Sequence, residues 1–173
     1  PGSEQRRVWS VLAAGSDALW VGHQDGLQQL TIAPDDTLQL QRQWPADALA
    51  GGMIDLLHRD REGQIWAASM GAGINRIDPA NGTVVRHLFA QQGLIGTEVQ
   101  QIGEGADRRT WVATDRGLYA FDPACTCWQV LIAESRVDAY SVAAQQIHAF
   151  VDGQLVGYHW REGLFRDEAF APR

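Results

Sequence analysis

The sequence contains no lysine and no long apolar run, and each absence excludes a class of protein. All 14 basic residues are arginine, against 21 acidic residues, so the formal net charge is −7. Such a chain lacks the basic surface that nucleic-acid phosphates or anionic lipids attract, so we predict no nucleic-acid partner. No run approaches the roughly 18–20 apolar residues that cross a bilayer, so membrane attachment is expected only through segments outside this sequence.

The sequence also opens without a signal-peptide pattern. Pro1, Gly2 and Ser3 are typical of a cloning scar, so residues 4–173 are taken as native and any export signal is expected before them. Hydrophobic residues make up 45% and charged residues 20%, the balance of a soluble globular domain or a piece of one. Seven Trp, 18 Gly and six Pro indicate many short strands joined by turns.

Tryptophan recurs at near-equal intervals inside a repeated pattern. Trp20, Trp66 and Trp111 lie 46 and 45 residues apart. Each follows aliphatic residues twelve and nine positions earlier, and each precedes a small residue at plus two and then a Gly–aliphatic pair. The glycines of these pairs are Gly26, Gly73 and Gly117. A further step of 45 residues places a fourth, degenerate register at Val156.

A period of about 45 residues with one tryptophan and many turn residues favours the four-stranded antiparallel blade of a β-propeller. Gly and Pro interrupt the chain too often for the helices of a helical solenoid. We therefore predict an all-β fold with repeats at about 6–50, 51–96, 97–140 and 141–173. The last repeat offers only three strands, so we expect a partial propeller, completed by the rest of a larger ring or by self-association.

The second repeat shows the expected strands most clearly, over 53–58, 64–69, 74–78 and 83–88. Gly63 is expected at positive φ in a turn that begins at Asp60, and Asn81-Gly82 predicts a type I′ turn. The run 65–68 is apolar without alternation, as expected for a strand covered on both faces. We predict that Trp20, Trp66 and Trp111 fill the gaps between blades; the alternative is core aromatics of an unrelated β-sandwich.

Three motifs carry a family resemblance. Residues 60–69 read Asp-x-x-Gly-x-Ile-Trp-Ala-Ala-Ser, residues 111–122 repeat the same strand and continue through Gly117, and Phe89-x-x-x-Gly93-Leu94 precedes the third repeat. This pattern resembles the two-component regulator propeller repeat, although the fourth repeat departs from it with Val156 and Tyr158. The resemblance implies a β-propeller on the periplasmic side of a membrane-anchored bacterial signalling protein. It also implies a histidine kinase or diguanylate cyclase output outside this chain.

The loops between the second and third strands of the blades are the candidate binding surface. They are expected to gather on one rim with the blade-to-blade links, and they differ between repeats while the strands repeat. Arg116 and Arg161 are predicted to clamp a carboxylate or sugar acid, and Trp160 to stack on a ring. The candidate ligand-binding residues are Gln24, Asp25, Met70, Asp115, Arg116, Trp160, Arg161 and Glu162. The alternative for each is a solvated turn residue.

Histidine and cysteine give two further possibilities. His23 and His159 are both expected at the end of a second strand, so a metal site between blades is weighed against solvated hairpin residues; we predict no metal and no cofactor. Cys125 and Cys127 are too few for a zinc site. They are expected to form a local disulfide, to pair with another chain, or to remain free thiols.

We predict a non-catalytic sensor, ligand-binding or protein-interaction module of a bacterial signal-transduction protein. The ligand is expected to be a small molecule or a glycan. One alternative is a propeller enzyme of lyase type, which would need His23, His159, Asp25 and Glu162 together at one channel mouth. The other is a pure protein–protein scaffold, which would show a flat apolar rim without a pocket.

Overall fold

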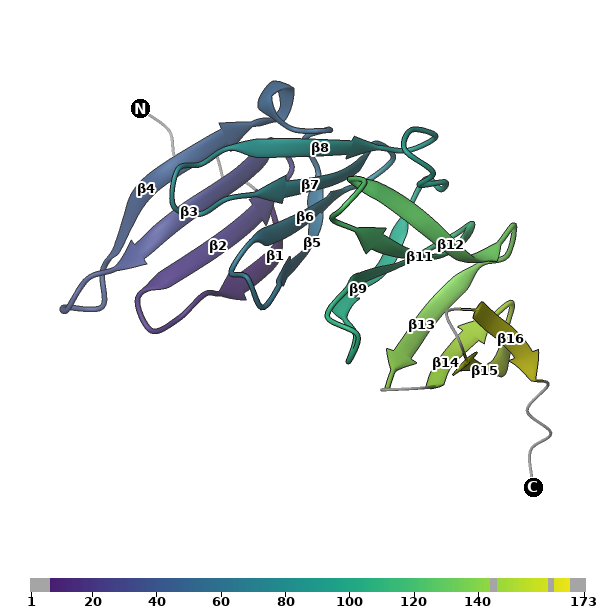
Figure 1. Ribbon diagram of the computed structural model, residues 1–173. Helices are drawn as coiled ribbons and strands as arrows, with labels where there is room; N and C mark the ends of the chain where they lie inside the picture. Colours follow the sequence, from purple (N-terminus) through teal and green to yellow (C-terminus); the bar gives the residue numbers. More distant parts are fainter. Residues whose placement is uncertain (1–6, 144–145, 162–163, 169–173) are drawn as a thin grey trace. The chain divides into compact units, whose positions relative to one another are not determined.

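The structure is a computed structural model that describes residues 7–143, 146–161 and 164–168. The chain divides into two compact units, Pro1–Leu88 and Phe89–Arg173. Each unit holds two four-stranded antiparallel sheets whose strands lie in chain order (Figure 1). Within the described residues, no helix is long and apolar enough to cross a membrane. The predicted all-β class and its four-stranded repeating sheet are confirmed.

The strands of the first unit form the first and second sheets. The first sheet contains β1 (Val8–Ala13), β2 (Ala18–His23), β3 (Gly26–Ile32) and β4 (Leu38–Pro45), and the short 3-10 helix η1 (Ala46–Ala48) follows it. The second sheet contains β5 (Ile54–Arg59), β6 (Ile65–Ser69), β7 (Gly73–Ile77) and β8 (Val84–Leu88).

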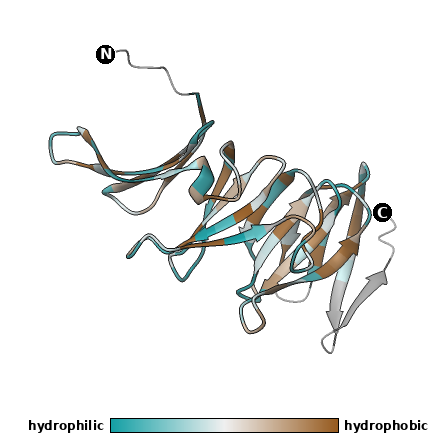
Figure 2. Ribbon diagram, turned by 90° about the horizontal axis from the view of Figure 1, so that it is seen from above, coloured by the Kyte–Doolittle hydropathy of each residue, from teal (hydrophilic) through white to brown (hydrophobic). Residues whose placement is uncertain are grey.

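The strands of the second unit form the third and fourth sheets. The third contains β9 (Val99–Glu104), β10 (Thr110–Thr114), β11 (Gly117–Asp122) and β12 (Cys127–Ala133). The fourth contains β13 (Val137–Val142), β14 (Gln146–Val151), β15 (Gln154–Arg161) and β16 (Leu164–Glu168). Figure 2 shows the most hydrophobic segments on the strands.

The four strands predicted for the second repeat are found within one residue of their expected bounds. Gly63 has φ +84°, and its N–H donates to the Asp60 carbonyl oxygen at 3.0 Å, so the predicted turn is confirmed. The type I′ prediction is wrong, because Gly82 has φ +81° but Asn81 does not have a positive φ. Instead, the side-chain oxygen of Asn81 accepts the Thr83 N–H at 2.8 Å and shapes a longer hairpin loop.

The three repeated tryptophans are buried, at 0–1% exposure. In the first unit, Trp20 packs in a cluster that joins the first sheet to Ile54, Ile65 and Ala67 of the second. In the second unit, a cluster around Trp111 joins the third sheet to the fourth. Burying an indole removes about 150–250 Å² from water, worth several kcal/mol at about 25 cal/mol/Å². Trp20 and Trp111 therefore each lie between two neighbouring sheets of their unit, and the same role for Trp66 stays a prediction.

Aspartates at the turns before β6 and β10 position two of the indole rings. Trp66 Nε1 donates to Asp60 Oδ2 at 2.8 Å, and Trp111 Nε1 donates to Asp107 Oδ1 at 3.1 Å. The guanidinium of Arg109 also lies over the Trp111 ring, 5.3 Å from its centroid. The indole N–H groups of Trp66 and Trp111 thus each have a carboxyl acceptor, so these two rings are buried without losing a hydrogen bond.

Glycine begins the third strand in the first three sheets, and in two of them the backbone requires it. Gly26 has φ +136°, and a Cβ there would collide with the carbonyl oxygen of Trp44. At Gly117 a Cβ would collide with the carbonyl oxygen of Ile132. Gly73 also has a positive φ, +143°. At Gly26 and Gly117 the close approach of a neighbouring backbone excludes a side chain, and at Gly73 the positive φ favours glycine.

One backbone hydrogen bond recurs in all four sheets. It identifies which residues occupy equivalent positions in the four repeats. The residue after the second strand donates its N–H to the carbonyl oxygen of the residue before the first strand, at 3.0–3.3 Å. The donors are Gln24, Met70, Asp115 and Asp152. Four residues before each donor stand Trp20, Trp66, Trp111 and His148. The fourth tryptophan position is therefore occupied by His148.

The predicted register at Val156 is wrong, and so is the prediction of an incomplete last repeat. Val156 lies on the third strand, β15, opposite Ala149, and the fourth sheet has all four strands. The segment 134–136 that leads into the fourth sheet is much shorter than the segment 89–98 that leads into the third. A constant step of 45 residues therefore overshoots the second strand. The third sheet ends at Ala133, so residues 137–140 belong to the fourth sheet.

Candidate functional site

The loops after the second strands are fixed to the segments that lead into the first strands. Asp115 shows this most clearly: its Oδ1 accepts the N–H groups of Thr97 and Glu98 at 2.7 and 3.1 Å, and its Oδ2 accepts the Thr97 hydroxyl at 2.9 Å. Burial acts to raise the pKa of this carboxyl, but the hydrogen bonds outweigh it and hold the pKa below its ordinary value. The Asp115 carboxylate is thus engaged within the protein.

The fourth sheet has the same arrangement at Asp152. Its Oδ1 accepts the Arg136 N–H at 3.0 Å, and its own N–H donates to the Arg136 carbonyl oxygen at 3.0 Å. Sequence reasoning missed Asp152 because the misplaced register put this residue in the turn before the second strand. The sequence feature that indicates its role is an aspartate directly after the second strand, which Asp152 shares with Asp115.

In the second sheet, Ser69 and Asn75 hold the corresponding segment. The Ser69 hydroxyl donates to the Gly51 carbonyl oxygen at 3.2 Å, and Asn75 Oδ1 accepts the Ala50 N–H at 2.7 Å. Both side chains are buried. Met70, the predicted ligand residue, follows directly and is 44% exposed. The loop backbone is therefore fixed while the side chain at its tip faces solvent.

In the first sheet, His23 is buried and its Nδ1 accepts the Asp25 N–H at 3.2 Å. The side chains of Gln24 and Asp25 are exposed. His159 does not occupy an equivalent position, because it lies within β15, the third strand of the fourth sheet. The predicted equivalence of the two histidines is therefore wrong.

Arg116 combines a fixed backbone with an exposed side chain. Its N–H donates to Thr114 Oγ1 at 3.0 Å, and its carbonyl oxygen accepts the Tyr119 hydroxyl at 3.3 Å. Burial raises the pKa of Tyr119, which keeps this hydroxyl protonated as a donor. The guanidinium extends into solvent, where it can form paired hydrogen bonds to a carboxylate.

Trp160, Arg161 and Glu162 do not belong to the loop in which they were predicted. Trp160 and Arg161 end β15, which pairs with β16, and Glu162 lies outside the described residues. This connection joins the third and fourth strands, at the opposite end of the sheet from the loop after the second strand. The equivalent of the other candidate loops in the fourth sheet is Asp152-Gly153.

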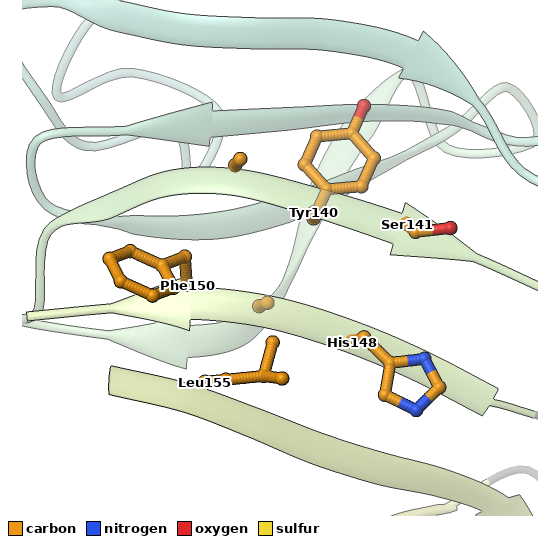
Figure 3. Close-up of a pocket in the computed structure, with 7 residues that line it drawn as sticks. Tyr140, Ser141, His148, Phe150 and Leu155 are labelled. Carbon is orange, nitrogen blue, oxygen red and sulfur yellow. The ribbon is translucent and has the colours of Figure 1, made fainter. Parts of the chain in front are cut away.

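A hollow on the fourth sheet was not predicted. It has a volume of about 450 Å³ and is lined by residues of β13, β14 and β15. Figure 3 shows His148, Phe150 and Leu155 beside one another, with the Tyr140 hydroxyl directed away from them. The hollow lies beside His148, the residue that replaces the repeated tryptophan. Its lining is almost entirely apolar, so it offers contact area and few hydrogen bonds.

The cysteines form a disulfide, Cys125–Cys127, in the loop between β11 and β12, which decides among the three alternatives. Across residues 7–143, 146–161 and 164–168, no three His, Cys, Asp or Glu side chains lie close enough together to hold a metal ion.

No family model matches the sequence, and no curated protein matches it. The fold is similar to the extracellular domain of a protein from B. thetaiotaomicron described as a hybrid two-component system, BT3049, with 20% identity and a TM-score of 0.69. That match covers 88% of this chain and 22% of the other. A second extracellular domain from the same organism, BT4673, described as a one-component system, gives 16% identity and a TM-score of 0.72, covering 93% and 23%.

A catalytically inactive virginiamycin B lyase from Staphylococcus aureus is also similar, with 11% identity and a TM-score of 0.67. The match covers 98% of this chain and 57% of the lyase. These similarities show the fold alone. The four sheets are β-propeller blades, and their number is that of a partial propeller. The chain spans less than a quarter of the length of the two B. thetaiotaomicron domains.

Proposed function

We propose that this chain is the non-catalytic, ligand-binding part of an extracytoplasmic sensor propeller in a bacterial signal-transduction protein. The carrying observation is the recurring bond that fixes each loop after a second strand, while the side chains beyond it face solvent. A rigid loop with variable exposed side chains binds a ligand with little loss of conformational entropy. The ligand is a small molecule or glycan whose carboxylate accepts hydrogen bonds from the Arg116 guanidinium.

Two further observations support this proposal. Structural neighbours over 88–93% of the chain are described as extracellular domains of bacterial signalling systems. The Cys125–Cys127 disulfide suits an oxidising compartment such as the periplasm, because cytosolic thiols are kept reduced. The kinase or cyclase output would then lie in another part of a longer, membrane-anchored protein.

A lyase function is less well supported by the same residues. His23 is buried and its Nδ1 already accepts an N–H group, while the Asp115 carboxylate accepts three hydrogen bonds. A general base must reach a substrate proton, and these two groups point into the protein's own backbone. We therefore propose binding without chemistry for this chain.

Calorimetric titration of the 173-residue chain with sugar acids, dicarboxylates and neutral glycans tests the proposal. At least one acidic class is expected to bind, and Arg116→Ala should weaken that binding about tenfold or more, the loss of one charge-assisted hydrogen bond. Arg61→Ala is the matched control, because Arg61 is exposed at the opposite end of its sheet, in the turn before β6. Absence of any binding, or equal losses in both variants, would contradict the proposal.

A further inference from the structure

The Cys125–Cys127 disulfide lies at the surface, in the hairpin loop that joins β11 to β12 of the third sheet. Residues 123–126 of this loop are all exposed, and Cys127, the first residue of β12, is half-buried. The bond is therefore open to molecules in solution, and it is most open on the side of Cys125.

The second sheet builds the same hairpin without cysteine. Residues 78–80 and 122–124 both read Asp-Pro-Ala, and in each loop the aspartate Oδ1 accepts the alanine N–H, at 2.8 and 2.9 Å. Two residues after the alanine, Gly82 has φ +81° and Thr126 has φ +53°. The positions of the two cysteines are held in the second sheet by Asn81 and Thr83. The loop therefore adopts this conformation without needing a disulfide.

The disulfide and the fold stabilise each other by the same amount. Reduction and unfolding form one thermodynamic cycle, so whatever the bond adds to the stability of the fold, the fold adds to the stability of the bond. Because a single residue separates the two cysteines, the bond constrains the unfolded chain little. The fold therefore favours the oxidised form by no more than about 30-fold. A disulfide that closes a loop of about 100 residues gains more than about 1,000-fold by the same reasoning.

We propose that Cys125–Cys127 is a reversible thiol–disulfide exchange site whose reaction partner is a thiolate. Exposed disulfides to which the fold contributes little are the ones that thiols reduce readily. The hairpin keeps its conformation after reduction, as its counterpart in the second sheet does without cysteine, so the third sheet is folded in both redox states. The site does not depend on the proposed ligand site, which lies at the opposite end of the sheet.

The exchange takes place in two steps. A thiolate attacks the Sγ atom of Cys125, a mixed disulfide forms as the bond to Cys127 breaks, and the Cys127 sulfur leaves as a thiolate that takes a proton from water. A second thiolate then attacks the sulfur of the bound thiol, and Cys125 leaves as a thiolate. Two partner thiols are thereby oxidised to one disulfide, and the protein disulfide is reduced to two thiols.

Equilibration of the 173-residue chain with mixtures of reduced and oxidised glutathione tests the proposal. Alkylation of the free thiols followed by mass spectrometry gives the reduced fraction. The equilibrium constant for reduction should lie within about 30-fold of that of the same chain denatured in urea, and the rate of reduction within about tenfold. A larger difference in either quantity would overturn the proposal, because the fold would then protect the bond.

Two single variants identify the sulfur that is attacked. Cys127→Ser leaves the exposed Cys125 thiol, and Cys125→Ser leaves the half-buried Cys127 thiol. Both variants should fold, because the second sheet forms this hairpin without cysteine. Oxidised glutathione should modify the Cys125 thiol at least about tenfold faster, since access limits the reaction of a thiol. Equal rates, or faster modification of Cys127, would contradict the assignment of Cys125.

Small thiols and protein dithiols share this chemistry, and the rate of reduction distinguishes them. A thioredoxin that reduces the bond at least about 100-fold faster than dithiothreitol at equal concentration assigns a protein dithiol as the partner, and a smaller difference assigns a small thiol. The far-UV circular dichroism of the reduced chain should match that of the oxidised chain. A bond that neither reagent reduces in the folded chain, or a reduced chain that has unfolded, would overturn the proposal.

Discussion

The Tyr140 hydroxyl donates a 2.6 Å hydrogen bond to the carbonyl oxygen of Trp111, which ties the first strand of the fourth sheet to the second strand of the third. Gln101 adds two more bonds across the same interface. Its Oε1 accepts the Tyr140 N–H at 2.9 Å, and its Nε2 donates to the Tyr140 carbonyl oxygen at 3.2 Å. Polar contacts thus fix the spacing of two blades that apolar packing holds together.

Tyr140→Phe should destabilise the protein by about 1–2 kcal/mol, because the Trp111 carbonyl loses a buried donor. Urea denaturation at neutral pH measures the change. Tyr119→Phe is the comparison, since its hydroxyl makes a longer bond, 3.3 Å, to a carbonyl of an exposed residue and should matter less. Equal stability of wild type and Tyr140→Phe would contradict the assignment.

The same tyrosine predicts a loss of stability at alkaline pH. Burial, assisted by the negative charge of Asp107, raises the pKa of Tyr140 above its ordinary value of 10.0. As pH rises above roughly 10, the unfolded chain loses this proton while the folded chain keeps it, so the free energy of unfolding falls. Urea midpoints between about pH 8 and pH 11 should decline less steeply in Tyr140→Phe. Parallel declines would show that another group is responsible.

Asp115→Ala should cost about 1–2 kcal/mol at neutral pH, because two N–H groups and a hydroxyl lose their acceptor. The pKa of Asp115 is depressed below 3.8, so its contribution is present above that pH and disappears as pH falls through the depressed value. The gap between wild type and variant should therefore narrow below about pH 4. Asp25→Ala, a change at an exposed loop residue of the first sheet, should leave the stability at neutral pH almost unchanged.

A pair of tryptophan substitutions tests the register of the fourth sheet. His148→Trp adds an indole beside a hollow of about 450 Å³ and should be tolerated. Val156→Trp adds it on the side packed against the third sheet, and overpacking there should cost about 1–3 kcal/mol. Thermal unfolding compares the two melting temperatures, and His148→Trp should melt at the higher one. A higher melting temperature for Val156→Trp would instead support the register predicted from the 45-residue step.

Removing the disulfide should have a small effect on stability. Cys125 and Cys127 are separated by one residue, and a loop this short constrains the unfolded chain little, by less than about 2 kcal/mol. The double variant Cys125→Ser, Cys127→Ser should therefore unfold close to the wild type, while thiol titration of the denatured wild type finds no free thiol. Two titratable thiols in the wild type would contradict the assigned bond.

The second repeat could be predicted almost completely from the sequence, because its turns carry Asp60, Gly63 and Gly82 at the expected places. Trp20, Trp66 and Trp111 could also be identified as buried, since their spacing and the small residues after them recur. The hairpin at Asn81 could not, because its loop is shaped by backbone N–H groups that donate to the side-chain oxygens of Asp78 and Asn81.

The fourth repeat shows where periodicity failed. His148 does not resemble the tryptophan it replaces, and Gly153-Gln154-Leu155 imitates the start of a second strand, so the step of 45 residues seemed to continue. The role of Asp115 was also missed, because a carboxylate at a loop tip looks the same in sequence whether it binds a ligand or the protein's own backbone. Only the approach of Thr97 and Glu98 distinguishes the two.

The central claim is that the four sheets are equivalent repeats, with His148 at the position of the repeated tryptophan. Amide hydrogen exchange by NMR tests this claim most directly, because the equivalence rests on four backbone N–H groups that lie outside the strands. The amides of Gln24, Met70, Asp115 and Asp152 should exchange slowly, at rates close to those of the adjoining second strands. Exchange of these four amides at the rates of an unstructured chain would contradict the alignment, and with it the placement of His148 at the fourth tryptophan position.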